Sequence, residues 1–422
     1  RRLAQKDDPC SAAYARALDE ADELRAFRED FHFPEGEDVT YLCGNSLGLQ
    51  PKSIRQAVLK DLDRWAAFGV EGHFLEEGPG VPWWTIEDIA RRDVATLVGA
   101  EENEVAVMNS LTVNLHLALA AFYAPTPERS EILVEANAFP SDEYVVQSVA
   151  QNRGLDPSTV VARVDAPDTA TLVASIRERR PALVLVSPLQ YYTGTLYDIR
   201  EIVRAAKDVG AVAGLDLAHA VGNVELHLHD DAPDFACWCS YKYLNAGPGA
   251  IAGAFVHEDA TFRNEPLRGW WGNRRATRFE MRASFDPQPG VAGLQLSNPP
   301  TLPVIALKEA ASLHARATMP RLRAKSKRLT AYLEQLLRLK LGDRNPKMLT
   351  PADPDCRGAQ LSLLFPSDVD AVFKALRARG VFVDVRRPNV IRVAPAPIYN
   401  SFDDVRRFVE ILAEILQETA EG

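Results

Sequence analysis

Short apolar runs alternate with amphipathic segments between about residues 90 and 260. Seven of these runs have the length and β-branched content of buried strands: 104–108, 131–135, 159–163, 183–187, 212–217, 235–240 and 250–256. Helical spacing of apolar residues separates several of them, at 112–122, 141–152, 170–179 and 199–208. This alternation predicts an α/β fold with a mostly parallel seven-stranded sheet and helices on both faces.

The flanking segments have a different pattern. Residues 11–30 have the spacing of a charged amphipathic helix, 31–41 are typical of a loop, and a helix is expected from 53 to 65. After a proline-rich stretch at 298–303, a long helical pattern at 304–341 is interrupted at Pro320, and 360–418 mixes strands with helices. We therefore expect a segment 1–50 that packs on the small domain, a large domain 51–300, and a small α+β domain 301–422.

Charge and cysteine content narrow the classes of function. The chain has 48 basic and 58 acidic residues, a formal net charge of −10, and no basic stretch, which argues against nucleic acid and anionic membranes as partners. Its five cysteines lie far apart or in apolar surroundings and have no metal-ligand spacing, so we expect free thiols and no metal. No apolar segment has the length of a signal or a membrane span, and a cytoplasmic location is expected.

Lys242 is the first candidate for chemistry. It follows the apolar run 234–239, so it should emerge near the end of a buried strand. A lysine that is removed from water has a lowered pKa and can act as an amine nucleophile. The alternative is an ordinary surface lysine in a loop.

Asp216 is the second candidate, because it ends an apolar run and His219 follows three residues later. A carboxylate at this edge of a sheet can pair with a protonated pyridine nitrogen, which makes pyridoxal phosphate (PLP) an electron sink. The alternative is a helix N-cap with a packing histidine. The occurrence of Lys242 one strand later favours the cofactor interpretation.

Two further strand-to-helix turns have suitable side chains. Ser110 and Thr112 stand where a strand meets an apolar helix, and the free N–H groups of a first helical turn attract a phosphate. In the second turn, Phe139 could stack on a flat cofactor and Asp142 could accept a hydrogen bond beside it. Simple helix capping explains either turn equally well when each is considered alone.

Together these segments resemble the kynureninase family, which belongs to the fold-type-I PLP enzymes of aminotransferase class V. The resemblance runs from about residue 40 to 415, and its most specific part is DLAHAVGN followed by CSYKYLNAG. The matching segments are YLCGNSLGLQP (41–51), MNSLTVNLHL (108–117), AFPSDEY (138–144), LQYYTG (189–194), GLDLAHAVGNVELHLHDDAPDFACWCSYKYLNAGPG (214–249), GWWG (269–272), LSNPP (296–300) and IRVAPAPIYNSF (391–402).

The resemblance implies a role for each matching residue. Lys242 would form the Schiff base with PLP, and Asp216, with His219 beside it, would bind the ring nitrogen. Arg392 would pair with the substrate α-carboxylate, and Ser46, His73 and Asn298 would lie near the substrate's aromatic end. The remaining cofactor contacts would be Leu111, Thr112, Phe139, Pro140, Ser141, Asp142, Ser187 and Tyr241, with Trp270 and Asn298 supplied across a homodimer interface.

Two assignments stay open at this point. Trp271 follows Trp270 where the family commonly has phenylalanine, so either indole could reach the cofactor. Tyr241 could transfer a proton or could only bind phosphate.

The resemblance also implies the reaction. It would be PLP-dependent hydrolysis of the Cβ–Cγ bond of L-kynurenine or 3-hydroxy-L-kynurenine, which yields L-alanine and anthranilate or 3-hydroxyanthranilate in tryptophan catabolism and NAD biosynthesis. The polar side chains of His73 and Asn298 favour the hydroxylated substrate. The alternatives are another class V enzyme, such as a cysteine desulfurase or lyase with Cys356 as its thiol, and a non-catalytic scaffold.

Overall fold

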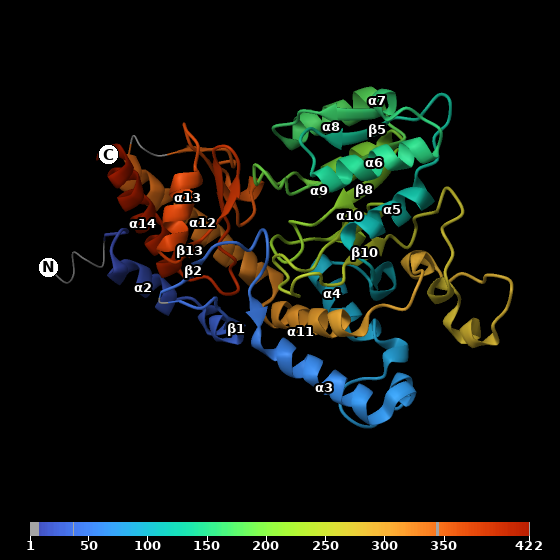
Figure 1. The fold of residues 1–422 in the computed structure, drawn as a ribbon. Helices are drawn as coiled ribbons and strands as arrows, with labels where there is room; N and C mark the ends of the chain where they lie inside the picture. Colours follow the sequence, from blue (N-terminus) through green and yellow to red (C-terminus); the bar gives the residue numbers. More distant parts are fainter. Residues whose placement is uncertain (1–7, 37, 343–345, 422) are drawn as a thin grey trace.

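The computed structural model describes residues 8–36, 38–342 and 346–421, which form a larger and a smaller body side by side (Figure 1). The larger body is built on a seven-stranded sheet of order β4-β10-β9-β8-β7-β5-β6. Strands β9, β8, β7, β5 and β6 are mutually parallel, and β10 is antiparallel to both of its neighbours. The strands are β4 (Val105–Val107), β5 (Ile132–Glu135), β6 (Val161–Val164), β7 (Leu183–Val186), β8 (Val212–Asp216), β9 (Phe235–Trp238) and β10 (Gly253–Val256).

Each face of this sheet has its own hydrophobic core, because successive side chains of a strand point to opposite faces. In β7, Leu183 and Leu185 belong to one core, and Val184 and Val186 belong to the other. One core is covered by α5 (Leu111–Phe122) and α6 (Pro140–Asn152). The other is covered by α4 (Asp88–Val98), α8 (Thr169–Arg179), α9 (Ile199–Asp208) and α11 (Thr301–Ala317). The predicted mostly parallel, doubly covered sheet is thus confirmed.

The smaller body has a four-stranded sheet of order β11-β12-β15-β14, packed against helices. Its sheet consists of β11 (Lys347–Met348), β12 (Leu361–Leu364), β14 (Asp384–Arg386) and β15 (Val390–Val393). Its helices are α12 (Met319–Leu341), α13 (Asp370–Ala378) and α14 (Phe402–Glu421). Strand β11 has only two residues, and the sequence pattern did not predict it.

The N-terminal segment lies against the smaller body. Helix α2 (Ala12–Glu20) packs on α14, and Asp19 accepts hydrogen bonds from the amides of Phe402 and Asp403 at the start of that helix. The 31–41 stretch, predicted as a loop, carries β1 (Phe31–His32) and β2 (Thr40–Tyr41) at its ends. Strand β2 pairs with β13 (Val381–Phe382) of the smaller body.

The boundary expected near residue 300 does not separate two packing units. Helix α11 begins at Thr301, but it packs on α4 and on α3 (Lys52–Phe68) of the larger body. The helical pattern breaks at Thr318, which has a φ of 64° and lies just before Pro320. The division of the chain into domains remains a prediction.

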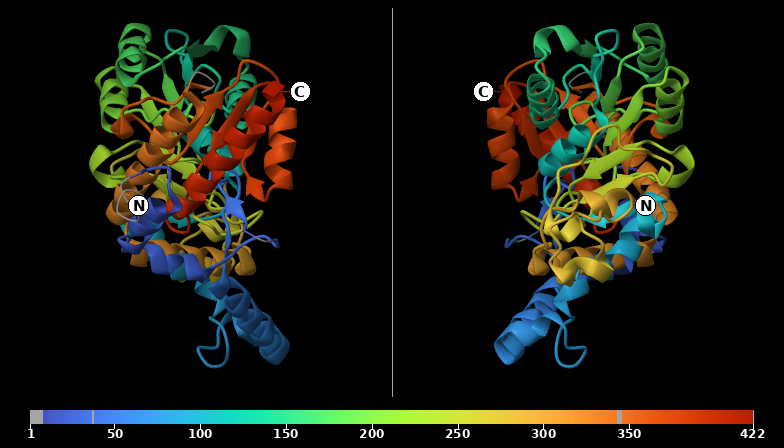
Figure 2. Two further views of the ribbon diagram at one scale, coloured as in Figure 1. Left: turned by 90° about the vertical axis from the view of Figure 1, so that its left-hand side faces the viewer. Right: turned by 90° about the vertical axis from the view of Figure 1, so that its right-hand side faces the viewer.

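Helix α3 and the short helical turn η2 (Gly69–His73) form an arm that projects from the rest of the molecule (Figure 2). Arg64 holds the arm's tip together, because its Nε donates to the carbonyl of Gly72 at 2.9 Å. Among the helices in the described ranges, none has both the length and the apolar content needed to cross a bilayer.

Candidate active site

A cavity of about 130 Å³ lies at the carboxyl ends of the parallel strands. Open α/β sheets usually bind ligands at this edge. Its lining brings together eleven of the residues singled out in the sequence: Ser110, Leu111, Thr112, Phe139, Ser141, Asp142, Ser187, Asp216, His219, Tyr241 and Lys242. The structure adds Tyr191 and Ala218 to this wall.

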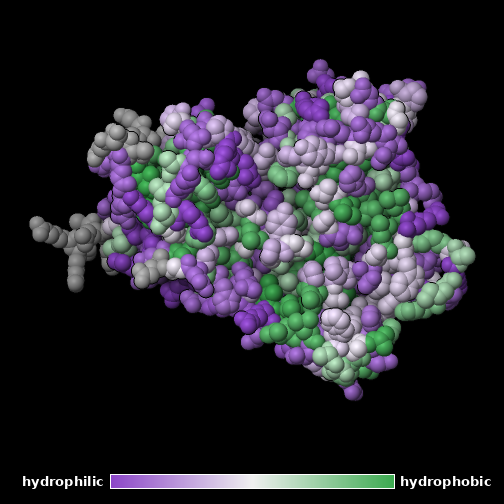
Figure 3. All heavy atoms as spheres, in the orientation of Figure 1, coloured by the Kyte–Doolittle hydropathy of each residue, from purple (hydrophilic) through white to green (hydrophobic). Residues whose placement is uncertain are grey.

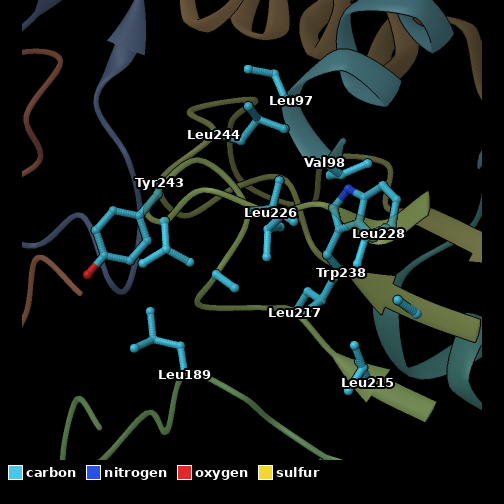
Figure 4. Packing of buried hydrophobic residues seen from close by; sticks show 14 of the residues in the cluster. Leu97, Val98, Leu189, Leu215, Leu217, Leu226, Leu228, Trp238, Tyr243 and Leu244 are labelled. Atoms are coloured by element: carbon cyan, nitrogen blue, oxygen red, sulfur yellow. The ribbon is translucent and has the colours of Figure 1, made fainter. Parts of the chain in front are cut away.

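The turn that carries Lys242 is fixed from two sides. On one side, the next two residues, Tyr243 and Leu244, are buried in the hydrophobic core that Figure 4 shows around Trp238. On the other side, the amide of Gly48 donates to the carbonyl of Tyr241 at 2.9 Å. A Cβ on Gly48 would lie 2.3 Å from the carbonyl oxygen of Lys242, so only glycine allows the two turns to approach this closely.

The amine of Lys242 faces His219. The Nζ of Lys242 lies 2.9 Å from Nε2 of this buried imidazole. The pKa of His219 is lowered well below its ordinary value, first by burial and then by the positive charges of Lys242, Arg392 and Arg386. The imidazole is therefore neutral and can accept a hydrogen bond from the lysine ammonium.

Two carboxyl groups lie together on the cavity wall. Asp216 ends β8 and accepts the amide of Ala218 at 2.7 Å, and its side chain is hydrogen-bonded to that of Asp142 in the first turn of α6. Burial is the largest cause that raises the pKa of both groups. No helix begins directly after Asp216, so the alternative that it is a helix N-cap is wrong.

A third buried carboxyl group, Glu135, was not singled out in the sequence. It ends β5, and both of its oxygens lie 3.3 Å from the amide of Ser187, which follows β7. Burial raises the pKa of Glu135 to about 8. The available signal was an acidic residue that directly follows the apolar run Ile132–Val134.

The opposite end of the cavity suits an anion. Ser110 is the N-cap of α5, but its side chain makes no capping hydrogen bond, and Ser110, Leu111 and Thr112 all line the cavity. The first N–H groups of a helix have no intrahelical acceptor and attract phosphate.

The lining residues fit PLP. Lys242 offers an amine for the aldehyde, the Asp216–Asp142 pair offers a carboxylate for the ring nitrogen, and the start of α5 offers donors for the phosphate. The rings of Phe139 and Tyr191 meet edge to face, with centroids 5.3 Å apart. Within the described part of the chain, the buried Oδ1 of Asp142 has no hydrogen-bond partner, as expected if a bound group supplies one.

The structure does not bring every predicted site residue to this cavity. Pro140 is the first residue of α6, and Ser46 is exposed on the turn that packs against the Lys242 turn. His73 lies on the projecting arm, where its ring packs on Trp83. Asn298 is exposed.

The two neighbouring tryptophans have different surroundings. Trp270 is 46% exposed and donates to the carbonyl of Arg278 at 3.0 Å. Trp271 is buried, and its indole donates to Glu87 at 3.1 Å. In this chain, Trp270 is therefore the indole that is open to a partner.

Arg392 does not line the cavity itself, but it contacts Tyr191, which does. Its Nη1 donates to the carbonyl of Tyr191 at 2.7 Å, and its Nη2 pairs with Asp384 at 2.7 Å. Tyr191 was not assigned a role from the sequence. Its contact with Arg392 is made by the backbone carbonyl, which every residue type has.

Comparison with known families gives a consistent result. Residues 322–412 match the model of the kynureninase C-terminal domain. Kynureninase of Xanthomonas campestris pv. campestris (strain B100) is 49% identical over 418 residues, which cover 96% of this chain and 97% of the relative. Kynureninase of Xanthomonas oryzae pv. oryzae (strain PXO99A) is 49% identical over 416 residues, with 95% and 97% coverage.

Solved structures resemble the fold at lower sequence identity. A cysteine desulfurase from Thermococcus onnurineus NA1 has a TM-score of 0.76 at 18% identity, covering 93% of this chain and 98% of that one. A cysteine desulfurase from Escherichia coli has a TM-score of 0.75 at 18% identity, covering 94% and 99%. At this identity the likeness concerns the fold alone.

Proposed function

The chain belongs to the kynureninase family, and from this premise we propose that Lys242, Asp216 and His219 carry out its reaction. The protein is a PLP-dependent hydrolase that cleaves the Cβ–Cγ bond of L-kynurenine or 3-hydroxy-L-kynurenine, releasing L-alanine and the corresponding anthranilate. The observation that carries the residue assignment is the single cavity shared by the amine of Lys242, the carboxyl group of Asp216 and the imidazole of His219.

Different polar side chains would hold the proton on the ring nitrogen and remove the proton from the substrate Cα. When bound, PLP supplies an electron sink for the pair of electrons released at the substrate Cα. The buried Asp216–Asp142 pair would hold a proton on the ring nitrogen, and Lys242 would bind the cofactor through Nζ and then remove the proton from Cα. Neutral His219 would accept a hydrogen bond from Nζ and keep it aimed into the cavity. Tyr241 would either transfer a proton or bind only the phosphate.

Substrate recognition would use groups outside the cavity lining. Arg392 would bind the α-carboxylate, since a planar guanidinium suits bidentate contact with a carboxylate. Ser46, His73 and Asn298 would lie near the aromatic end. Because an unpaired buried polar group disfavours an analogue that lacks its partner, His73 and Asn298 favour 3-hydroxy-L-kynurenine.

We also propose that the protein works as a homodimer with shared active sites. Trp270 and Asn298, which the family resemblance assigns to the cofactor site, lie outside this chain's own cavity lining. Large apolar side chains are exposed at Val113, Trp270, Phe279, Met281 and Leu302. Figure 3 shows hydrophobic residues reaching the surface over the part of the larger body where α5 and α11 lie in Figure 1. An exposed apolar patch of this kind is typical of a protein interface.

The free cysteines support a cytoplasmic location. All five lie in the described ranges and are free thiols. Unpaired thiols suit a reducing compartment, which supports the cytoplasm, and a role in tryptophan catabolism and NAD biosynthesis is proposed on the family resemblance.

A fluorescence assay tests the function. The PLP-loaded protein should release fluorescent anthranilate from L-kynurenine. Its kcat/KM should be higher for 3-hydroxy-L-kynurenine, whose turnover is measured by the release of 3-hydroxyanthranilate. Release of sulfide from cysteine with no anthranilate would instead support the desulfurase alternative.

A further inference from the structure

Two guanidinium groups, not one, lie beside the proposed carboxylate site. Arg386 of β14 and Arg392 of β15 both pair with Asp384, at 2.9 Å and 2.7 Å. The guanidinium carbon of each lies 5.9 Å from the ring centre of Tyr191, which lines the cavity. The two positive charges therefore flank the same part of the cavity wall.

The charges at this place do not balance. Among the residues that the structure describes, Asp384 is the one carboxylate that pairs with either guanidinium. Two positive charges and one negative charge leave a net charge of about +1 in a setting where Arg392 is buried and Arg386 is half-buried. The charge reaches the catalytic groups, because both arginines lower the pKa of His219 after the larger effects of burial and Lys242. An anion is the missing partner.

The two arginines differ in the donors they have left. Arg392 already uses Nε, Nη1 and Nη2, which donate to Asp384 and to the carbonyl of Tyr191. Arg386 donates only through Nη1, to Asp384 and to the carbonyl of Val385. Within the described part of the chain, its Nε and Nη2 have no acceptor, and these two groups form one edge of the fork that binds a carboxylate.

The two arginines also differ in freedom. The side chain of Arg392 is 1% exposed and anchored at three nitrogens, whereas that of Arg386 is 36% exposed. A long side chain that is anchored at one nitrogen can turn without opening the core. Arg386 can therefore move toward an arriving ligand while Arg392 stays in place.

We propose that Arg386 is a second substrate-contacting guanidinium, which turns its free Nε–H and Nη2–H to the α-carboxylate that Arg392 binds. This inference rests on the proposed function, since it concerns the carboxylate end of the same substrate. It assigns recognition of the amino-acid class to a pair of arginines that share Asp384.

Arg386→Gln tests the inference, with Arg387→Gln as its matched control. Arg387 is the next residue, and its side chain pairs with Asp370 on the surface. Binding to the PLP-loaded protein is followed by absorbance with two probes: L-alanine, which has the α-carboxylate, and kynuramine, which is kynurenine without it. Arg386→Gln should weaken L-alanine binding roughly 10- to 100-fold, as expected for a hydrogen bond between charged groups, and should leave kynuramine binding nearly unchanged.

The control variant should bind both probes as the wild type does. Equal weakening of L-alanine and kynuramine by Arg386→Gln would overturn the inference, because it would indicate a general disturbance of the site. Unchanged L-alanine binding would overturn it as well. Since L-alanine binding needs no turnover, a wild-type protein that produced no anthranilate would count against the proposed function and not against this pair.

Discussion

At the scale of single residues, the site depends on carboxyl groups that burial keeps away from water. Asp142, Asp216 and Glu135 are all buried, and burial is the largest cause of the raised pKa of each. Repulsion from the carboxyl group of Asp216 adds to this effect at Asp142 and Glu135. The cavity can therefore face a cationic ring nitrogen without holding three full negative charges.

Glu135 gives this arrangement a measurable pH dependence. Its pKa rises from an ordinary value of 4.5 in the unfolded chain to about 8 in the folded one. The stability contributed by the neutral carboxyl group is present below pH 4.5 and is lost as the pH rises toward 8. Each unit of such a shift corresponds to about 1.4 kcal/mol.

Glu135→Gln should therefore become more stable relative to the wild type as the pH rises from 4.5 to 8. The measurement is the urea midpoint of both proteins across this range. Glu131→Gln is the control, because Glu131 lies just before β5 and pairs with Arg179 near the surface. A difference between Glu135→Gln and wild type that does not change with pH would contradict the assignment.

Side-chain chemistry was visible in the sequence wherever a reactive residue ended an apolar run. Lys242 and Asp216 were predicted in this way, and both line the cavity. Tyr191 could not be predicted in this way. It acts through its backbone carbonyl, which accepts hydrogen bonds from Arg392 and Gln360, and every residue type has such a carbonyl. The unequal surroundings of Trp270 and Trp271 also required the structure, since their residue types are the same.

At the scale of elements, fully buried strands were the most predictable part of the fold. All seven predicted runs overlap strands of the central sheet, because strands covered on both faces are apolar at almost every position. The two-residue strands β1, β2 and β11 were not predicted, since two residues are too few to show a period. Tertiary pairing alone defines them.

Packing shows to which body of the molecule helix α11 belongs, which the sequence left undetermined. A proline-rich stretch precedes this helix, which suggested that a new domain begins at residue 301. Its buried face contacts α3 and α4, so the helix is part of the core beneath the sheet. Periodicity shows that a helix has an apolar face, but it does not show which partner covers that face.

At the scale of the whole molecule, the two bodies meet at the wall of the cavity. The carbonyl of Tyr191 accepts from Gln360 and Arg392, that of Tyr192 from Ser362, and that of Thr193 from Thr350. Side chains of the smaller body thus hold three successive residues of the larger body. A shift of the smaller body would move Tyr191 directly.

The proposed dimer predicts complementation between two defective variants. The Lys242→Ala variant would lack the amine, and the Asn298→Ala variant would lack the contact across the interface. A dimer of one chain of each variant would contain one site with neither change. After unfolding and refolding together, an equal mixture should recover about a quarter of wild-type activity, from the statistics of pairing two chains. Ser297→Ala, at a neighbouring position that is also exposed, is the control and should be active alone. A mixture no more active than the sum of its parents would contradict shared sites.

The central claim is that the amine of Lys242 carries the cofactor, and borohydride labelling tests it most directly. The PLP-loaded protein is reduced with borohydride, digested, and its peptides are analysed by mass spectrometry, with Lys242→Ala treated in parallel. The account predicts one pyridoxyl group on Lys242 in the wild type and none in the variant. A label on another lysine, or an equal label in the variant, would contradict it.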